Sequence, residues 1–400
     1  MTPSPLAERI ADLAVEVGAN VQAGQIVTVS AEIGLEEVAR AIAARAYRQG
    51  ARFVDVTYYD PQVKRARIEH AEEDTLEFVP PWYGKRVFEL GRSHSARVVV
   101  VAPSDPGALL GLDPERLGRD QLPTLPEWME VLSARTVNWT IVPYPTMGWA
   151  RLCHPELGDQ AALDLLHREI VHVCRLDEPD PGAAWRKRVA ELTAVGERLN
   201  QLELDALHYE GPGTDLTVGL LPSSTWIGAV STTVEGLEHL PNVPTEEVFT
   251  TPDPTRAEGK VRSTRPLVLV DGSIVRGLEV RFERGRAVEV VAEEGGEVIS
   301  TRTARDEGAA RLGEVALVDR ESRIGQLGTV FYETLLDENA TSHIAFGSAY
   351  EEAVSETDLP RINKSGIHID FMVGGDDVDV TGITSSGDRV PVLGGGAWQI

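Results

Sequence analysis

The sequence predicts a doubly wound α/β domain in its N-terminal half and an α+β domain, rich in antiparallel strands, in its C-terminal half. The first half shows a strand, a helix and a strand joined by short connections, which is the pattern of a parallel sheet. From His208 onward, short apolar segments alternate with glycine and aspartate turns, which is the pattern of antiparallel sheets. The chain has 400 residues, enough for two such domains.

Alternating helices and strands open the chain. Apolar residues at helical spacing predict a helix over 5–17, and an apolar run predicts a strand over 25–30. A second amphipathic helix is expected over 35–49 and a second strand over 53–58. Further expected elements are strands at 97–102 and 136–142 and a helix at 161–175. Together these elements predict a Rossmann-like domain over residues 1–180.

This domain lacks the sequence signature of a nucleotide-binding fold. The turn after its first strand reads Ser-Ala-Glu-Ile-Gly at residues 30–34, which is not GxGxxG. A phosphate-binding GxxxxGK segment is also missing from the sequence. We therefore expect a structural or oligomerising role for this domain.

A polar, proline-rich segment at 177–182 predicts the boundary between the two domains. A bridging helix is expected after it, over 183–204. The following strands predict an antiparallel β-rich domain, interrupted by one helix at 303–312, that spans residues 181–400 and carries the candidate metal site. The predicted strands are 206–209, 215–220, 267–270, 278–282 and 287–292.

The composition argues against several classes of partner. The formal net charge of −25 disfavours nucleic acid and anionic lipid, because phosphate groups attract Lys and Arg. The sequence has no apolar run of about 18 residues, so we expect no transmembrane helix. Residues 1–6 do not resemble a secretory signal, and the cysteines, Cys153 and Cys174, form no CxxC motif. These features predict a cytoplasmic protein.

Acidic and histidine residues between 314 and 370 predict a metal site. Glu314 lies inside the apolar segment 312–318, where a carboxylate is costly unless it faces solvent or binds a cation. Glu338 lies five residues before His343, a spacing that fits two ligands across a turn and not the helical HExxH pair. The alternative for His343 is a partly buried histidine with ordinary hydrogen-bond partners.

Two further pairs of residues extend this candidate site. His368 and Asp370 alternate with apolar residues, so on a strand both side chains share one face, which meets either a metal or solvent. Glu246 and Glu247 are adjacent, and in an extended chain their side chains point to opposite faces. Only one of them can therefore face the site, unless both are surface carboxylates.

Two imidazoles and several carboxylates make a mixed nitrogen and oxygen ligand set, which suits Zn, Mn, Co or Fe more than Ca. With Glu247 and Glu338 included there are enough ligands for two ions, so we interpret the set as a two-metal hydrolase centre that activates water. The sequence also has no GxSxG serine motif. One alternative is a mononuclear non-haem iron oxygenase that uses His343, His368 and one carboxylate. Another is a non-catalytic metal-binding protein.

The sequence resembles the M29 metallo-aminopeptidases of the thermophilic aminopeptidase T type over nearly its whole length. The most specific matching segments are DENATSH at 337–343 and IHIDFM at 367–372. The segments NVPTEEVFTTP at 242–252, LGEVALV at 312–318 and GPGTDLTVGL at 211–220 agree in order and spacing. Before residue 137 the match is one of architecture more than of motif.

The resemblance implies an enzyme that removes N-terminal residues from peptides with a free N-terminus. It implies two divalent ions per chain (Zn, Co, Mn or Mg), water activated by them, and a homodimer. Two residues receive catalytic roles: Tyr350 as donor to the developing oxyanion, and Glu247, taken in preference to Glu246, as proton carrier. The implied metal ligands are Glu247, Glu314, Glu338, His343, His368 and Asp370.

Overall fold

The computed structural model describes residues 3–120, 122–123, 125–269 and 272–400, which form two compact units. Unit 1 comprises residues 1–187 and 230–244, and unit 2 comprises residues 188–229 and 245–400. The sequence-based boundary at residue 180 lies just before helix α9 (Pro181–Gln201), whereas the units divide inside this helix. The search of the described residues for a helix long and apolar enough to cross a membrane found none.

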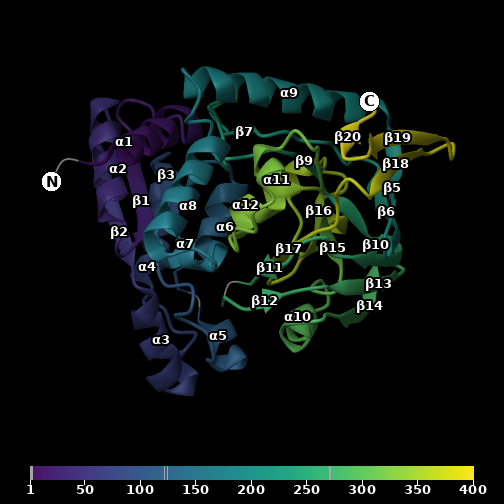
Figure 1. Ribbon diagram of the computed structural model, residues 1–400, viewed down its shortest axis with the longest axis horizontal. Helices are drawn as coiled ribbons and strands as arrows, with labels where there is room; N and C mark the ends of the chain where they lie inside the picture. The colour runs from purple at the N-terminus through teal and green to yellow at the C-terminus, as the bar shows by residue number, and fades with distance from the viewer. Residues whose placement is uncertain (1–2, 121, 124, 270–271) are drawn as a thin grey trace. The chain divides into compact units, whose positions relative to one another are not determined.

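A parallel sheet forms the centre of unit 1 (Figure 1). Its strand order over the described residues is β2-β1-β3-β4, and each neighbouring pair runs parallel. The strands are β1 (Ile26–Glu32), β2 (Phe53–Tyr59), β3 (Ala96–Val101) and β4 (Asn138–Pro143). The predicted parallel arrangement of this half of the chain is therefore confirmed.

Helices connect the strands of unit 1, and their starts follow local capping rules. The Ser4 hydroxyl accepts a hydrogen bond from the Ala7 N–H, and Pro5 occupies the first turn of the first helix. A short hairpin, β7 (Ser231–Thr232) with β8 (Glu238–His239), completes the unit. The helices are α1 (Pro5–Asp12), η1 (Leu13–Gly18), α2 (Glu36–Arg48), α3 (Pro61–His70), η2 (Glu73–Thr75), α4 (Trp82–Arg92), α5 (Pro114–Arg119), α6 (Pro126–Ser133), α7 (Met147–Cys153) and α8 (Asp159–Val173).

Unit 2 is built mainly on antiparallel sheets, as its short strands predict. Over the described residues, one sheet has the order β14-β13-β10-β6-β5-β18-β19-β20 and another the order β17-β16-β15-β9, with β11 and β12 paired separately. The strands are β5 (Leu204–Gly211), β6 (Thr214–Leu220), β9 (Glu247–Thr250), β10 (Pro252–Arg262), β11 (Leu267–Val268), β12 (Ile274–Val275), β13 (Glu279–Glu283), β14 (Arg286–Val291), β15 (Leu312–Val318), β16 (His343–Gly347), β17 (His368–Met372), β18 (Asp379–Thr384), β19 (Arg389–Gly394) and β20 (Ala397–Trp398). The predicted strand at 267–270 ends at residues outside the described ranges.

Short helices lie between the strands of unit 2. They are α10 (Gly296–Thr303), α11 (Arg323–Leu327), α12 (Thr334–Asp337), η3 (Glu338–Ala340), η4 (Glu351–Ala353) and η5 (Leu359–Arg361). The helix predicted at 303–312 is wrong, because the helix in this region ends at Thr303. The following residues form turns held by distant partners: the Asp306 carboxylate accepts from the Gly366 N–H at 2.8 Å, and the Gly308 carbonyl accepts from Asn363 Nδ2 at 2.8 Å. Such non-local contacts override the helical preference of the alanines in this segment.

The β17-β16-β15-β9 sheet has one apolar face, which packs on the larger sheet. The ring centroids of Phe346 in β16 and Phe371 in β17 lie 4.9 Å apart, and Phe282 of β13 lies 5.9 Å from Phe346. Each of these three side chains is almost completely buried. Because side chains alternate along a strand, the opposite face of the same sheet is free to carry polar groups.

Gly347 ends β16 in a conformation that only glycine adopts easily. Its φ is +98°, and a Cβ placed there would lie 2.1 Å from the Ile367 carbonyl oxygen. The absence of a side chain thus allows β16 and the start of β17 to approach closely. This approach brings His368 level with Gly347 across the sheet.

Candidate metal centre

The polar face of the β17-β16-β15-β9 sheet carries five of the six predicted ligands. Glu314 pairs across the strands with Ala345, and Ala345 pairs with Asp370. Cross-strand partners and residues two apart share a face, so these pairings place the following side chains on one face. They are Glu247, Glu314, His343, His368 and Asp370. The small Ala316 and Ala345 lie among them on that face.

The donor atoms of these side chains converge. His368 Nε2 lies 3.1 Å from Glu314 Oε2 and 3.2 Å from Asp370 Oδ1, and His343 Nε2 lies 3.2 Å from Glu247 Oε2. Each of three overlapping groups holds donor atoms within 4.8 Å of one another. The groups are Glu247 with Glu314 and His343, Glu314 with His368 and Asp370, and Glu338 with His343 and Asp370. We call these six residues the carboxylate–histidine centre.

Burial excludes the surface alternatives for the carboxylates on the sheet of this centre. Glu314 is 4% exposed, His343 1% and Asp370 9%, so none of them is a solvated surface group. All seven residues of β15 are buried, so the strand has no solvent-facing side on which Glu314 could be hydrated. A buried carboxylate requires partners, and here the partners are the other members of the centre.

Glu338 reaches the centre from a short helix and not from the sheet. It begins η3, which follows α12 and leads directly into β16. The neighbouring Asn339 is completely buried and fixes this turn, since its Nδ2 donates to the Leu335 carbonyl at 3.0 Å and its Oδ1 accepts from the Glu246 N–H at 2.7 Å. Sequence reasoning assigned no role to Asn339, although it lies inside the DENATSH segment.

The adjacent Glu246 and Glu247 have different partners. Glu246 Oε2 accepts a hydrogen bond from Arg188 Nε at 2.7 Å, and Arg188 also contacts Asp319 Oδ1 at 3.2 Å. Glu247 faces His343 in the centre. Arg188 thus neutralises Glu246 in a buried ion pair, whereas Glu247 makes no ion pair with an arginine or lysine among the described residues.

The geometry of the donor atoms fits a bound cation better than a hydrogen-bond network. Glu247 Oε2 and Asp370 Oδ1 are buried, and each lies 3.2 Å from a histidine Nε2, yet neither has a hydrogen-bond partner of good geometry within the described residues. His368 Nδ1 lies 2.8 Å from the Ser348 carbonyl, so this nitrogen donates its proton there, and Nε2 is the nitrogen that can offer a lone pair to a cation. A carbonyl that orients the second nitrogen in this way is typical of metal-binding histidines.

The negative charge of the buried carboxylates also favours the binding of cations in the centre. Burial, offset in part by His343, raises the pKa of Glu247 to about 7, and burial with four neighbouring carboxylates raises the pKa of Glu338 well above its ordinary range. Burial lowers the pKa values of both histidines, but the carboxylates around them outweigh it and raise these pKa values. Protons thus balance part of the negative charge, a task that divalent cations perform when bound.

Tyr350 lies at the edge of the centre. Its ring centroid is 5.2 Å from the His368 ring and 5.3 Å from the Phe249 ring, edge-on to both. Burial, together with Glu314 and the other carboxylates, raises the pKa of its hydroxyl well above 10. The residue as a whole is 38% exposed, and the charges that raise the pKa of its hydroxyl are those of the carboxylates of the centre. The hydroxyl therefore keeps its proton and can donate a hydrogen bond.

The two adjacent glutamates give a matched pair of substitutions. We expect Glu247→Gln to lower metal affinity by more than about 100-fold, because even groups that only orient metal ligands contribute about 10–100-fold. Glu246→Gln should instead leave metal content unchanged and lower the free energy of unfolding by about 2–4 kcal/mol, because it leaves Arg188 buried with less charge to balance it. Elemental analysis and urea unfolding of both proteins measure the two effects. If Glu246→Gln lost its metal and Glu247→Gln kept its full metal content, Glu246 and not Glu247 would be the metal ligand.

Glu333 is a buried carboxylate that the sequence did not single out. Its Oε2 is buried without a hydrogen-bond partner in the described ranges, and burial, with the charge of Asp337, raises its pKa to about 8. Between pH 4.5 and 8 the folded state keeps a proton that the unfolded chain has released, so stability falls as pH rises through this interval.

Removing the charge of Glu333 should therefore stabilise the metal-free protein in a pH-dependent way. We expect Glu333→Gln to change the free energy of unfolding little near about pH 5 and to raise it by about 1–3 kcal/mol near about pH 8. Urea unfolding at the two pH values, with Glu351→Gln on the surface as control, measures the difference. An equal change in the free energy of unfolding at both pH values would contradict the raised pKa of Glu333.

Comparison with known proteins places the whole chain in one family. Residues 4–398 match the family model described as thermophilic metalloprotease (M29). Aminopeptidase T of Thermus thermophilus is 42% identical over 402 residues, covering 98% of this chain and 98% of that protein. The solved structure of wild-type AmpT from Thermus thermophilus superposes with a TM-score of 0.91 at 41% identity, covering 98% of this chain and 99% of that chain.

A more distant structure shares the fold alone. A 2,5-dihydroxypyridine dioxygenase from Pseudomonas putida has a TM-score of 0.52 at 13% identity, covering 96% of each chain. Identity at this level carries no statement about activity. The family model and the relative with 42% identity, in contrast, both extend over almost every residue, so this chain belongs to the family of thermophilic metalloproteases (M29).

Proposed function

We propose that this chain is a metal-dependent aminopeptidase that removes N-terminal residues from peptides by means of two divalent ions held in the carboxylate–histidine centre. Family membership and the relatives named aminopeptidase support the activity. The observation that carries the two-ion proposal is the overlap of the three donor groups, since Glu314, His343 and Asp370 each belong to two of them. Glu314 and Asp370 are carboxylates with two oxygens each, so either could serve both ions of a pair about 3.5–4 Å apart, whereas His343 would bind one ion through one nitrogen.

Six side chains would hold the ions: Glu247, Glu314, Glu338, His343, His368 and Asp370. Their mixed nitrogen and oxygen donors suit Zn, Co or Mn, and the carboxylates also suit Mg. When bound, such ions lower the pKa of a coordinated water and polarise a carbonyl group.

The protein's own groups would bind the substrate and move its protons. A carboxylate of the centre would accept a hydrogen bond from the free α-amine of a peptide. Provided that Glu247 is not a tight ligand of an ion, its carboxylate would accept the proton released when water attacks and pass it to the leaving amine. The Tyr350 hydroxyl would donate a hydrogen bond to the oxygen of the attacked carbonyl as negative charge develops on it.

The remaining parts of the proposal concern the rest of the chain. All six ligand candidates lie in unit 2, so we assign the chemistry to that unit and a supporting role to unit 1. The family resemblance supports a homodimer. Cys153 and Cys174 form no disulfide in the structure, which supports a reducing compartment such as the cytoplasm.

Metal counting combined with substrate hydrolysis tests the proposed function. We expect two ions per chain by elemental analysis and release of p-nitroaniline from aminoacyl-p-nitroanilides. The same aminoacyl-p-nitroanilides with a blocked N-terminus should not be cleaved, because they lack the free amine. One iron per chain with oxygen consumption would support the oxygenase alternative, and bound metal without any hydrolysis would support a non-catalytic metal-binding protein.

A further inference from the structure

We propose that Thr251 is a positioning residue for Tyr350, and that it acts by tying the backbone of the Tyr350 loop to the end of β9. The Tyr350 loop is defined here as residues 348–361, between β16 and β17. The inference rests on the proposed function, in which Tyr350 donates a hydrogen bond to the reacting carbonyl oxygen.

Thr251 is itself held firmly. It is completely buried, and its carbonyl oxygen accepts a hydrogen bond from Ser224 Oγ at 2.6 Å. Its hydroxyl donates to the carbonyl oxygen of Tyr350 at 2.7 Å. Thr251 is therefore buried and makes two hydrogen bonds. One of them fixes the backbone of Tyr350, whose side chain has the proposed catalytic role.

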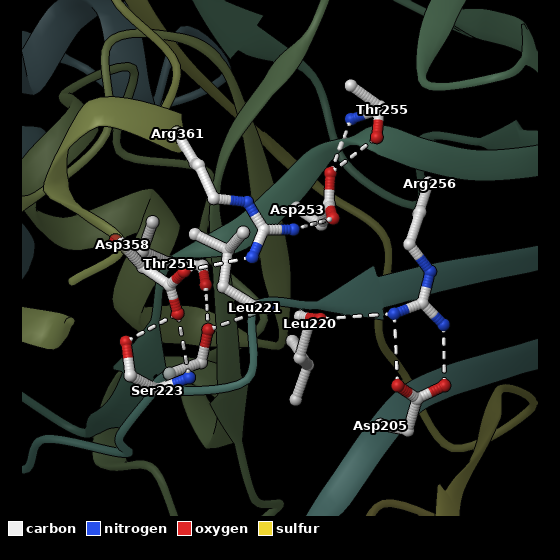
Figure 2. Close-up of polar contacts among 11 residues, drawn as sticks. Asp205, Leu220, Leu221, Ser223, Thr251, Asp253, Thr255, Arg256, Asp358 and Arg361 are labelled. Carbon is white, nitrogen blue, oxygen red and sulfur yellow. Dashed lines mark hydrogen bonds and ion pairs between the residues drawn. The ribbon is translucent and has the colours of Figure 1, made fainter. Parts of the chain in front are cut away.

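The far end of the loop is tied to the same segment of chain. Figure 2 shows Arg361 between two carboxylates: its guanidinium lies 2.9 Å from Asp358 Oδ1 and 3.2 Å from Asp253 Oδ2. Asp253 is two residues beyond Thr251, and Asp358 also accepts from the Ser223 hydroxyl at 2.7 Å. The short segment 251–253 thus contacts both the first and the last part of the loop.

The ring of Tyr350 is held by fewer contacts than its backbone, which accepts the hydrogen bond from Thr251. It makes edge-on contacts with Phe249 and His368, which limit its tilt, but its hydroxyl has no hydrogen-bond partner among those found in the described residues. The position of the hydroxyl is therefore set by the backbone from which the ring projects. A shift of about 1 Å at a catalytic group lowers turnover by up to about 100-fold.

Thr251→Val removes the hydroxyl and keeps the shape of the side chain. We expect kcat to fall between about three-fold and 100-fold, with KM changed less than about two-fold and metal content unchanged. Thr251→Ser retains the hydroxyl and should restore kcat. In a Tyr350→Phe background, Thr251→Val should lower kcat no further, because the group that it positions is already absent.

Thr250→Val is the matched control. Thr250 is equally buried and adjacent, but its hydroxyl donates to the Thr225 carbonyl at 2.9 Å and not to the Tyr350 loop. The Thr250→Val variant should therefore lose a buried hydrogen bond of the same kind as Thr251→Val does, and keep the wild-type kcat. An equal fall of kcat in Thr250→Val and Thr251→Val would show a general packing effect and overturn the inference.

The remaining outcomes separate the inference from the proposed function. A low kcat in Tyr350→Phe with a normal kcat in Thr251→Val overturns the inference and leaves the role of Tyr350 intact. A normal kcat in Tyr350→Phe overturns that role, and the inference with it. Additive losses in the double variant overturn the inference as well.

A second variant keeps the test decisive if Thr251→Val does not fold. The side chain of Arg361 is 49% exposed, so Arg361→Met removes the two contacts at the far end of the loop without opening a buried site. We expect kcat to fall at least about two-fold, again without a further effect in the Tyr350→Phe background. A wild-type kcat in Arg361→Met would overturn the anchoring of the loop.

Discussion

Glu314→Gln should lower kcat/KM for aminoacyl substrates by well over about 100-fold and release bound metal. Glu314, like Asp370, is a carboxylate that belongs to two of the three donor groups, and it lies 3.1 Å from His368 Nε2. In the proposed function this carboxylate serves two ions, so removing its charge would weaken the binding of both. Even groups that only orient ligands contribute about 10–100-fold to metal affinity. Isothermal titration with Zn or Co and steady-state hydrolysis measure the two losses.

The metal-free form of the same variant separates a site effect from a folding effect. Four carboxylates lie together in the metal-free centre, so removing one charge relieves repulsion. We expect metal-free Glu314→Gln to unfold at the same temperature as the metal-free wild type, or at a higher one. Glu321→Gln, at a side chain that is 68% exposed, is the control and should leave activity unchanged. Normal metal binding and turnover in Glu314→Gln would remove Glu314 from the site.

Removing the metal from the wild-type protein should abolish hydrolysis and lower thermal stability. Ligands that bind only the folded state stabilise it by mass action, about 2.7 kcal/mol for each site at a free concentration of 100 times Kd. Two sites therefore give about 5 kcal/mol, which for a unit of this size corresponds to a fall in Tm of roughly 10 °C on chelation. Calorimetry with and without EDTA measures the change, and adding Zn or Co should restore both stability and activity.

The Glu314→Gln variant is the control for the chelation experiment. Glu314→Gln, which has lost its metal, should show almost the same Tm with and without EDTA. A wild-type protein that keeps full activity after verified removal of its metal would contradict the proposed function. A fall in Tm that is as large in Glu314→Gln as in the wild type would show that EDTA acts elsewhere on the protein.

Local sequence pattern predicted the elements that depend on local physics. The helices over 35–49 and 161–175 and the four parallel strands lie close to α2, α8 and β1 to β4, because amphipathic periodicity and apolar runs report burial directly. The helix expected at 303–312 was wrong because the turns at 304–311 are held by Asn363 and Gly366, far along the chain. No local pattern carries that information.

The sequence by itself determined which residues were candidates for the site. His-x-Asp alternation placed His368 and Asp370 on one face of a strand, and the family motifs pointed to Glu338, His343 and Tyr350. Alternation also required Glu246 and Glu247 to point apart, although it left open which of them faces the site.

Tertiary structure decided what the candidates meet. Strand register puts Glu314, Ala345 and Asp370 in one row, and the position of Arg188 gives Glu246 an ion-pair partner while Glu247 faces His343. The Thr251 bond to Tyr350, across 99 residues, likewise exists only in the folded chain. The physical reason is the same each time: a carboxylate in an apolar strand is costly until a partner is near, and only the fold brings that partner near.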